Sequence, residues 1–236
     1  MFIVVLIVAL LPVAVLWQYI WKKDPNKEPT SQLIKALLLG AAICVPVAFF
    51  ELIAANIFSG GADEPTSWFG VVVDAFMVAA IPEESVKLLV LWLFLRRNRY
   101  YDEHFDGIIY AVCIGLGFAT VENVFYVYGD EDWLAVAFSR ALLAVPGHYA
   151  FAVLMGYYYS VYHFIDHSKK AAAYVLLVPV MAHGVYDSLA LSGAVNPVIG
   201  AVCFIVLIIF CVKMHKFAKS KMMASIENDN QIVNKI

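Results

Sequence analysis

Seven long apolar stretches limit what this chain can fold into more than any other feature of its sequence. A helix needs roughly 20 apolar residues to cross a bilayer, and all but the short last stretch reach that length. They occupy residues 1–21, 33–58, 68–95, 107–128, 134–162, 171–191 and 197–212. Of the 236 residues, 63% are hydrophobic and 15% are charged, whereas a soluble domain is about half apolar and about a quarter charged. The sequence therefore predicts an all-α, polytopic bundle of about seven transmembrane helices.

The basic residues predict how this bundle lies in the cell membrane. All but two of the 16 Lys and Arg residues fall in or beside the first, third and fifth connections, or in the tail that follows the last stretch. Cytoplasmic segments are enriched in Lys and Arg, and the opposite connections are acidic or neutral, as at Asp63-Glu64 and Asp130-Glu131-Asp132. We expect an N-terminus outside, a C-terminus in the cytosol, one transmembrane domain over residues 1–212, and a polar cytosolic tail over residues 213–236.

Ten ionisable side chains lie inside the predicted spans, where an unpaired charge costs roughly 2.5–3.5 kcal/mol. Lys87 and Arg140 are the two basic residues that lie neither in the basic connections nor in the tail. We expect Arg140 to be structural and to pair with Glu51 or Asp74. The remaining six are acids and histidines: Glu83, Glu84, Glu122, His148, His183 and Asp187. A purely structural bundle would not retain so many, so the sequence predicts a functional site inside the membrane.

The depths of these side chains indicate that they meet. At about 1.5 Å of rise per residue, four consecutive spans bring polar groups to one level between the midplane and the outer third: Glu83 and Glu84, then Glu122, then His148, and finally His183 with Asp187. Residues four apart share a helix face. Lys87 is therefore expected beside one of the paired glutamates, and Asp187 is expected to orient the imidazole of His183.

This combination of groups can carry out acid–base chemistry on water. Two adjacent glutamates point about 100° apart on a helix, so one can face a water-filled cavity and act as a general base while the other pairs with a neighbour. Three carboxylates and two histidines can activate water alone or with a divalent metal, and such ligands suit zinc. If a metal is bound, its predicted ligands are Glu122, His148 and His183. The predicted catalytic set is Glu83, Glu84, Lys87, Glu122, His148, His183 and Asp187.

Four motifs in this order resemble the PrsW family of intramembrane proteases, in the clan that includes CAAX prenyl proteases and bacteriocin-processing enzymes. Glu83–Lys87 is similar to the family's EExxK motif, and Phe118–Glu122, followed by Asn123, is similar to FxxxE. His148 stands where the family has a lone membrane histidine, and His183–Asp187 is similar to HxxxD. The CAAX branch has EExxxR and FxxxH instead, so Lys87 and Glu122 disfavour a prenyl-protein substrate.

The resemblance implies an endopeptidase that cuts a membrane protein inside the lipid bilayer. In the best-known members the substrate is a single-span anti-sigma factor that is cut on its extracytoplasmic side. The alternative is a transporter or proton-coupled channel, because intramembrane acids and histidines also form proton relays. Against that alternative, the two halves of the sequence show neither an internal repeat nor corresponding broken helices. The net charge of −3 gives no general attraction to nucleic acid.

Overall fold

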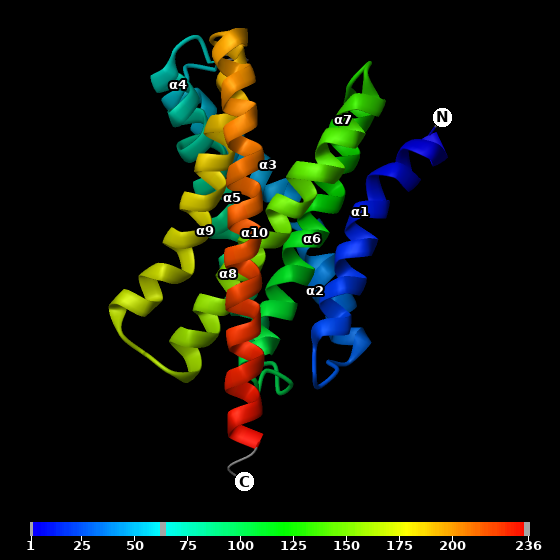
Figure 1. Ribbon diagram of the computed structural model, residues 1–236, viewed down its shortest axis with the longest axis vertical. Coiled ribbons are helices and arrows are strands. Elements are labelled where there is room, and N and C mark those ends of the chain that lie inside the picture. Colours follow the sequence, from blue (N-terminus) through cyan, green and yellow to red (C-terminus); the bar gives the residue numbers. More distant parts are fainter. Residues whose placement is uncertain (1, 62–64, 234–236) are drawn as a thin grey trace.

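The computed structural model describes residues 2–61 and 65–233, which fold into a bundle of helices without a strand (Figure 1). The all-α prediction is therefore confirmed. The helices are α1 (Phe2–Lys23), α2 (Thr30–Ala42), α3 (Cys44–Phe58), α4 (Trp68–Val73), η1 (Asp74–Ala80), α5 (Ile81–Leu95), α6 (His104–Gly129), α7 (Trp133–Ser139), η2 (Arg140–Ala144), α8 (Val145–Phe164), α9 (Lys169–Ala190), η3 (Leu191–Ala194) and α10 (Pro197–Val233). Of the three η segments, η1 and η2 are π-helices and η3 is a 3₁₀-helix.

Within residues 2–61 and 65–233, six continuous helical segments are long and apolar enough to cross a membrane: Leu6–Lys23, Thr30–Phe58, His104–Gly129, Trp133–Phe164, Lys169–Ala194 and Pro197–Gln231. The remaining predicted span, 68–95, is also one continuous helix, made of α4, η1 and α5. It carries Asp74, Glu83, Glu84 and Lys87, and this charge is what sets it apart from the six. The segment that looks least like a membrane span is therefore the one that brings the paired glutamates.

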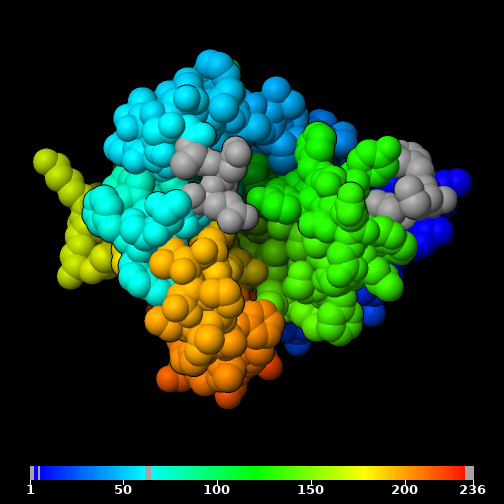
Figure 2. Space-filling view, turned by 90° about the horizontal axis from the view of Figure 1, so that it is seen from above, coloured from blue at the N-terminus to red at the C-terminus, as the bar shows by residue number. Residues whose placement is uncertain are grey.

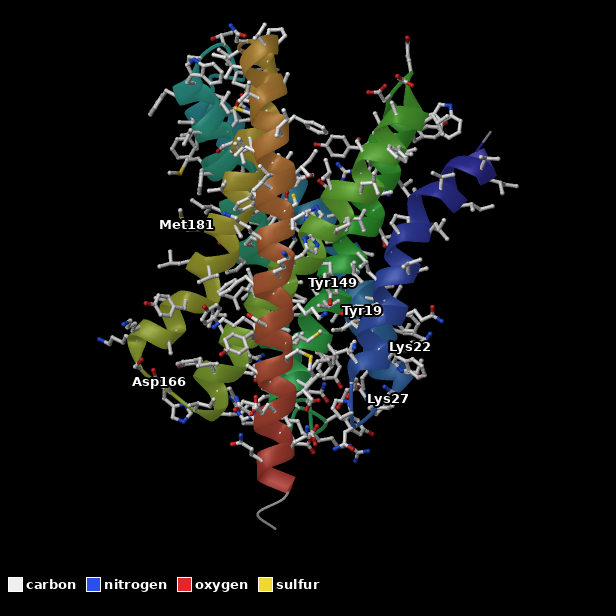
Figure 3. The ribbon with its side chains drawn as sticks, in the orientation of Figure 1. Tyr19, Lys22, Lys27, Tyr149, Asp166 and Met181 are labelled. Carbon is white, nitrogen blue, oxygen red and sulfur yellow. The ribbon has the colours of Figure 1, made fainter. Side chains whose placement is uncertain are left out.

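The basic connections lie at one end of the bundle, where α10 ends, and α1 begins at the opposite end (Figure 1). An odd number of crossings requires this placement of the two termini. Lys22 and Lys27 lie toward the end where α10 ends, as does Asp166 in the connection between α8 and α9 (Figure 3). Asp63 and Glu64, which the orientation argument also used, lie outside the described residues.

Helix α6 lies at the centre of the bundle because it is apolar on all sides. Its side chains from His104 to Ala119 are all buried. Two glycines let α2 approach it closely: a Cβ atom on Gly117 would lie 2.0 Å from the carbonyl oxygen of Leu37, and one on Gly40 would lie 2.0 Å from that of Ile114. Backbone contact of this kind, which small residues permit between membrane helices, fixes the position of the helix that carries Glu122.

The two π-helices stand directly before the segments that carry predicted site residues. Each runs into an α-helix with a proline at its start, Pro82 after η1 and Pro146 after η2. Proline lacks the N–H that would continue the hydrogen-bond ladder, and π-helical turns occur often at functional sites. Glu83 and Glu84 follow the first proline, and His148 follows the second. The distorted turns therefore set the direction in which these side chains point.

The segment that the sequence predicts as a polar tail continues α10 as far as Val233. A stripe of α10 residues at helical spacing is buried and continues into this segment: Leu207, Cys211, Met214, Ala218, Met222, Ser225 and Asp229. The carboxylate of Asp229 accepts hydrogen bonds from the backbone N–H groups of His104 at 2.8 Å and Phe105 at 2.9 Å. It thus caps the N-terminus of α6, where a negative charge is favourable.

Candidate active site

Lys87 lies at the centre of the polar groups inside the bundle. Its ammonium nitrogen Nζ donates to Oε2 of Glu83 at 2.7 Å and to Oε1 of Glu84 at 2.8 Å. It also lies 3.4 Å from Nδ1 of His148 and 4.2 Å from the centre of the Phe118 ring. The sequence predicted a contact with one glutamate. The structure shows that a single buried cation holds both, because positions three and four residues earlier lie on the same face of the helix.

His183 joins the glutamate pair to Asp187. Its Nδ1 lies 3.0 Å from Oε1 of Glu84, and its Nε2 lies 3.1 Å from Oδ2 of Asp187. The second contact is the pairing within α9 that the four-residue spacing predicted. Nε2 is also 3.9 Å from Oε1 of Glu83. The ring stacks on Phe151, with 4.7 Å between ring centres, so aromatic packing and two carboxylates together fix its orientation.

His148 connects the same centre to Glu122 and Arg140. Because an ammonium group has only donors, Nδ1 of His148 accepts from Lys87 and the ring proton lies on Nε2. Nε2 then donates to Oε2 of Glu122 at 2.7 Å. Nη2 of Arg140 donates to that same oxygen at 2.8 Å, and its Nε donates to Oδ1 of Asn123 at 2.8 Å. The expected pairing of Arg140 with Glu51 or Asp74 is therefore wrong.

The physical reason is the rotation of the helices, which depth alone does not give. The π-helix η2 directs Arg140 toward α6, where its guanidinium also lies 4.2 Å from the centre of the Tyr126 ring. Asp74 instead accepts a hydrogen bond from Ser59, and it lies apart from the site, as the sequence predicted. All seven predicted site residues are linked by these contacts, and Arg140 is the cation that sequence reasoning left outside.

A cavity of about 800 Å³ opens beside this network. Glu83 lines it and Glu84 does not, so the adjacent carboxylates point to different surroundings, as their angular separation predicted. Glu51 of α3 is a further acid in the wall that sequence reasoning did not assign to the site. Seen from the end that lies opposite the basic connections, the surface is hollowed between α3, α7 and the start of α10 (Figure 2). The remaining charged and imidazole side chains in the wall are Glu122, Arg140, His148, His183 and Asp187.

The residues of this centre fit a divalent metal. One ligand atom each of Glu83, Glu84 and His148 lies within 4.8 Å of the other two, and all three side chains are buried. Oε2 of Glu84 is buried and has no hydrogen-bond partner among the described residues. A buried acceptor without a partner is costly, and a cation bound there would remove that cost. Carboxylate oxygens and imidazole nitrogens are ligands that zinc accepts.

This group differs from the predicted ligand set of Glu122, His148 and His183. Only His148 belongs to both. Glu122 receives hydrogen bonds from His148 and Arg140, and both ring nitrogens of His183 face carboxylates. Glu122 thus lies behind His148 as carboxylates lie behind the imidazole ligands that they orient in metal sites.

A membrane-spanning bundle with acids and imidazoles around an internal cavity has the groups that a membrane-embedded hydrolase needs to activate water. The chain belongs to the PrsW family: a family model described as "PrsW family intramembrane metalloprotease" matches residues 28–213. It is thus a multi-pass intramembrane protease, as the resemblance implied, and the transporter alternative is not favoured. The family description also implies a metal.

Three proteins named "Protease PrsW" illustrate the relationship. The one from Clostridioides difficile (strain 630) is 36% identical over 189 residues, which cover 77% of this chain and 76% of the relative. The one from Geobacillus kaustophilus (strain HTA426) is 34% identical over 181 residues, 76% of each chain. The one from Bacillus subtilis (strain 168) is 32% identical over 179 residues, 75% of this chain and 78% of the relative. No solved structure matches this chain at a significant level.

Proposed function

We propose that this protease hydrolyses a peptide bond of a membrane protein near the extracytoplasmic side, with Glu83 as the base that activates water. The observation that carries the proposal is the difference between the adjacent glutamates: Glu83 lines the cavity, whereas Glu84 does not. A general base must reach the water from which it takes a proton. The fully buried Glu84, held by Lys87 and His183, instead fixes the positions of its neighbours.

The remaining residues supply orientation and proton transfer. His148, with its proton directed at Glu122, presents Nδ1 to the centre. Arg140 holds Glu122 and thereby the ring of His148. His183, oriented by Asp187, is the donor that would serve the carbonyl oxygen or the leaving nitrogen of the scissile bond. Hydrolysis requires such donors because charge develops on both atoms in the transition state.

Glu83, Glu84 and His148 are the residues that would hold the metal, and zinc is the ion that we propose. When bound, zinc would polarise the scissile carbonyl as a Lewis acid. A carboxylate has two oxygens, so Glu83 can contribute one to this group while the other accepts a proton from water. Lys87 keeps the two carboxylates together in the low-dielectric interior.

The proposed substrate is a single-span membrane protein, such as an anti-sigma factor, that is cut on its extracytoplasmic side. Two observations support this side of the membrane. The recess seen in Figure 2 is at the end of the bundle opposite the basic connections, and basic connections are typical of the cytoplasmic face. A scissile segment just outside the membrane would reach the cavity from that end.

Cleavage of a single-span reporter in cells that express the protein tests the proposal. The variants are Glu83→Gln, Glu84→Gln, His148→Ala and His183→Ala, each with its membrane abundance measured. We expect each to reduce cleavage by at least about 100-fold, the range in which loss of acid–base groups falls. Chelation of purified enzyme should abolish cleavage, and added zinc should restore it. Full activity in all four variants would contradict the proposed site.

A further inference from the structure

An apolar groove of about 820 Å³ runs along the outside of the bundle between η2 and α10. One wall is formed by Phe138, Leu142 and Leu143, and the other by Phe204 and Ile208. Leu142, Phe204 and Ile208 are all exposed, so these walls face the surroundings of the bundle. The floor is apolar along most of its length, and the groove ends beside His215 and Lys216.

The groove adjoins the catalytic cavity. Ser139, Leu143 and Phe204 line both, so the two spaces lie next to each other between η2 and α10. At the end of the groove near His215, the groove and the cavity are separated. There Nε2 of His215 lies 3.0 Å from the backbone oxygen of Pro146 and connects α10 to α8. Toward the extracytoplasmic end α7 and α10 diverge (Figure 1). The groove is thus closed at its cytoplasmic end and open toward the glutamates.

Its length matches a helical segment. Phe204 and His215 are eleven positions apart on α10, which corresponds to about 16 Å at 1.5 Å per residue. Counted from the start of α10 at Pro197, His215 lies about 27 Å along the helix, close to the thickness of about 30 Å of a bilayer's hydrocarbon core. The groove therefore covers the cytoplasmic part of a membrane crossing, and the cavity adjoins the other end of the groove, beside Phe204.

We propose that this groove binds the apolar transmembrane helix of the substrate, which enters laterally from the lipid between η2 and α10. The inference rests on the proposed function. The cytoplasmic part of the substrate helix packs between Leu142 and Ile208, and its extracytoplasmic end extends into the cavity beside Glu83. Apolar helices pack against membrane proteins through shape rather than charge, and the groove offers only apolar walls over this length.

The chain provides a matched control on the other side of the helix that α7 and η2 form together. A smaller apolar groove of about 370 Å³ lies between α1 and α7 and is lined by Leu134. None of its lining residues lines the catalytic cavity. Leu134 and Leu142 are both leucines, 60% and 59% exposed, and eight positions apart. A tryptophan at either position adds the same bulk, but only the one at position 142 narrows the path to the site.

The experiment compares two substrates in vesicles that contain purified full-length protein. One is a single-span reporter with its cleavage site on the extracytoplasmic side, and the other is a short peptide that covers the same cleavage site without the span. For Leu142→Trp and Ile208→Trp, we expect the ratio of reporter to peptide cleavage to fall at least about tenfold, because remote binding energy is lost for the reporter alone. For Leu134→Trp, the ratio should equal that of the wild type.

An unchanged ratio in both groove variants would overturn the proposal, as would a fall of equal size in Leu134→Trp. If the wild type cleaves neither substrate, or Glu83→Gln cleaves both, the proposed function itself fails and the groove proposal fails with it.

A second measurement does not depend on how tryptophan is tolerated. A photoreactive phenylalanine analogue at position 142 of the Glu83→Gln variant should crosslink to the reporter, and at position 134 it should not. Crosslinks to lipid alone from position 142 would overturn the proposal.

Discussion

Buried carboxylates gather at two depths in this bundle, and the protein neutralises them differently. In the candidate active site, Lys87 and Arg140 lie directly against the acids. At the cytoplasmic end, Asp24, Glu28 and Asp106 are also buried, but among the described residues no Lys or Arg forms an ion pair with them. Lys27, which lies beside this group, donates to the backbone oxygens of Trp21 and Asp24.

The difference follows from what each group of acids can do in its surroundings. At the cytoplasmic end, burial raises the pKa of Asp24 and of Glu28 above their ordinary values, so these two groups hold a proton more readily than exposed carboxyls do. Glu28 also accepts a hydrogen bond from the hydroxyl of Tyr110, and Asp24 accepts one from the backbone N–H of Glu28. A catalytic base must have a carboxylate oxygen free to accept a proton, and in the active site buried cations lie against the carboxylates instead.

The largest effect that this comparison predicts is the loss of Lys87. In chelated, metal-free protein, Lys87→Met leaves Glu83 and Glu84 buried without their cation, and breaking a buried ion pair from one side costs about 3–5 kcal/mol. We expect a decrease of that size in the free energy of unfolding, measured by denaturant titration in mixed micelles. The double variant Lys87→Met with Glu84→Gln should recover part of the stability and none of the activity.

Lys35→Met is the matched control for this prediction. Lys35 lies on α2 and is exposed, so its loss should change the free energy of unfolding by no more than about 0.5 kcal/mol. If Lys87→Met were as stable as Lys35→Met, the buried acids would not depend on a cation. The distinction between the two groups of carboxylates would then disappear.

A smaller effect, on cleavage activity, should show whether Arg140 acts by positioning His148 through Glu122. Loss of a partner behind a ligating histidine typically costs about 10–100-fold in activity. Arg140→Gln and Glu122→Gln should each reduce reporter cleavage by that amount. The double variant should cleave no more slowly than the less active of the two single variants, because both residues act on His148 through one chain of contacts. Arg96→Gln, at an exposed position in a basic connection, should leave cleavage unchanged. Multiplied losses in the double variant would show independent roles.

The sequence predicted which side chains meet in the site because membrane depth can be counted along a helix. Residue counts placed Glu83, Glu122, His148 and His183 at one level, and the four-residue spacing put Asp187 on the face of His183. The hydrogen bonds between His183, Glu84 and Asp187 agree with that reasoning. A bilayer gives every span the same two boundaries, and this makes depth easier to predict than most tertiary relations.

Rotation about the helix axis could not be predicted in the same way. The pairing of Arg140 with Glu122 depends on the π-helix η2, whose extra residue per turn leaves no simple mark in the hydrophobic pattern. Glu51 was expected as a partner for Arg140, but it lines the cavity instead. Asp229 caps α6 from beyond the last predicted span, a contact between residues that are far apart in the sequence. Such contacts depend on packing rather than on local pattern.

The smallest predicted effect concerns the cytoplasmic group and its dependence on pH. Because burial raises the pKa of Asp24 and of Glu28 above 3.8 and 4.5, respectively, the folded chain binds more protons than the unfolded chain at pH values just above these. Stability must therefore fall as the pH rises through the raised pKa values, and it does not recover above them. Asp24→Asn combined with Glu28→Gln keeps a hydrogen-bond acceptor at each position and removes the charge.

We expect this double variant to melt about 2–4 °C above the wild type near pH 8, the shift that about 1 kcal/mol gives a chain of this size. The difference should vanish near about pH 3, where both carboxyls are protonated in the folded and the unfolded chain. Asp130→Asn, at an exposed acid, should melt like the wild type at both pH values. Reporter cleavage should not change in any of these variants. A variant that melts below the wild type near pH 8 would mean that the cytoplasmic acids, like those of the active site, are held as anions.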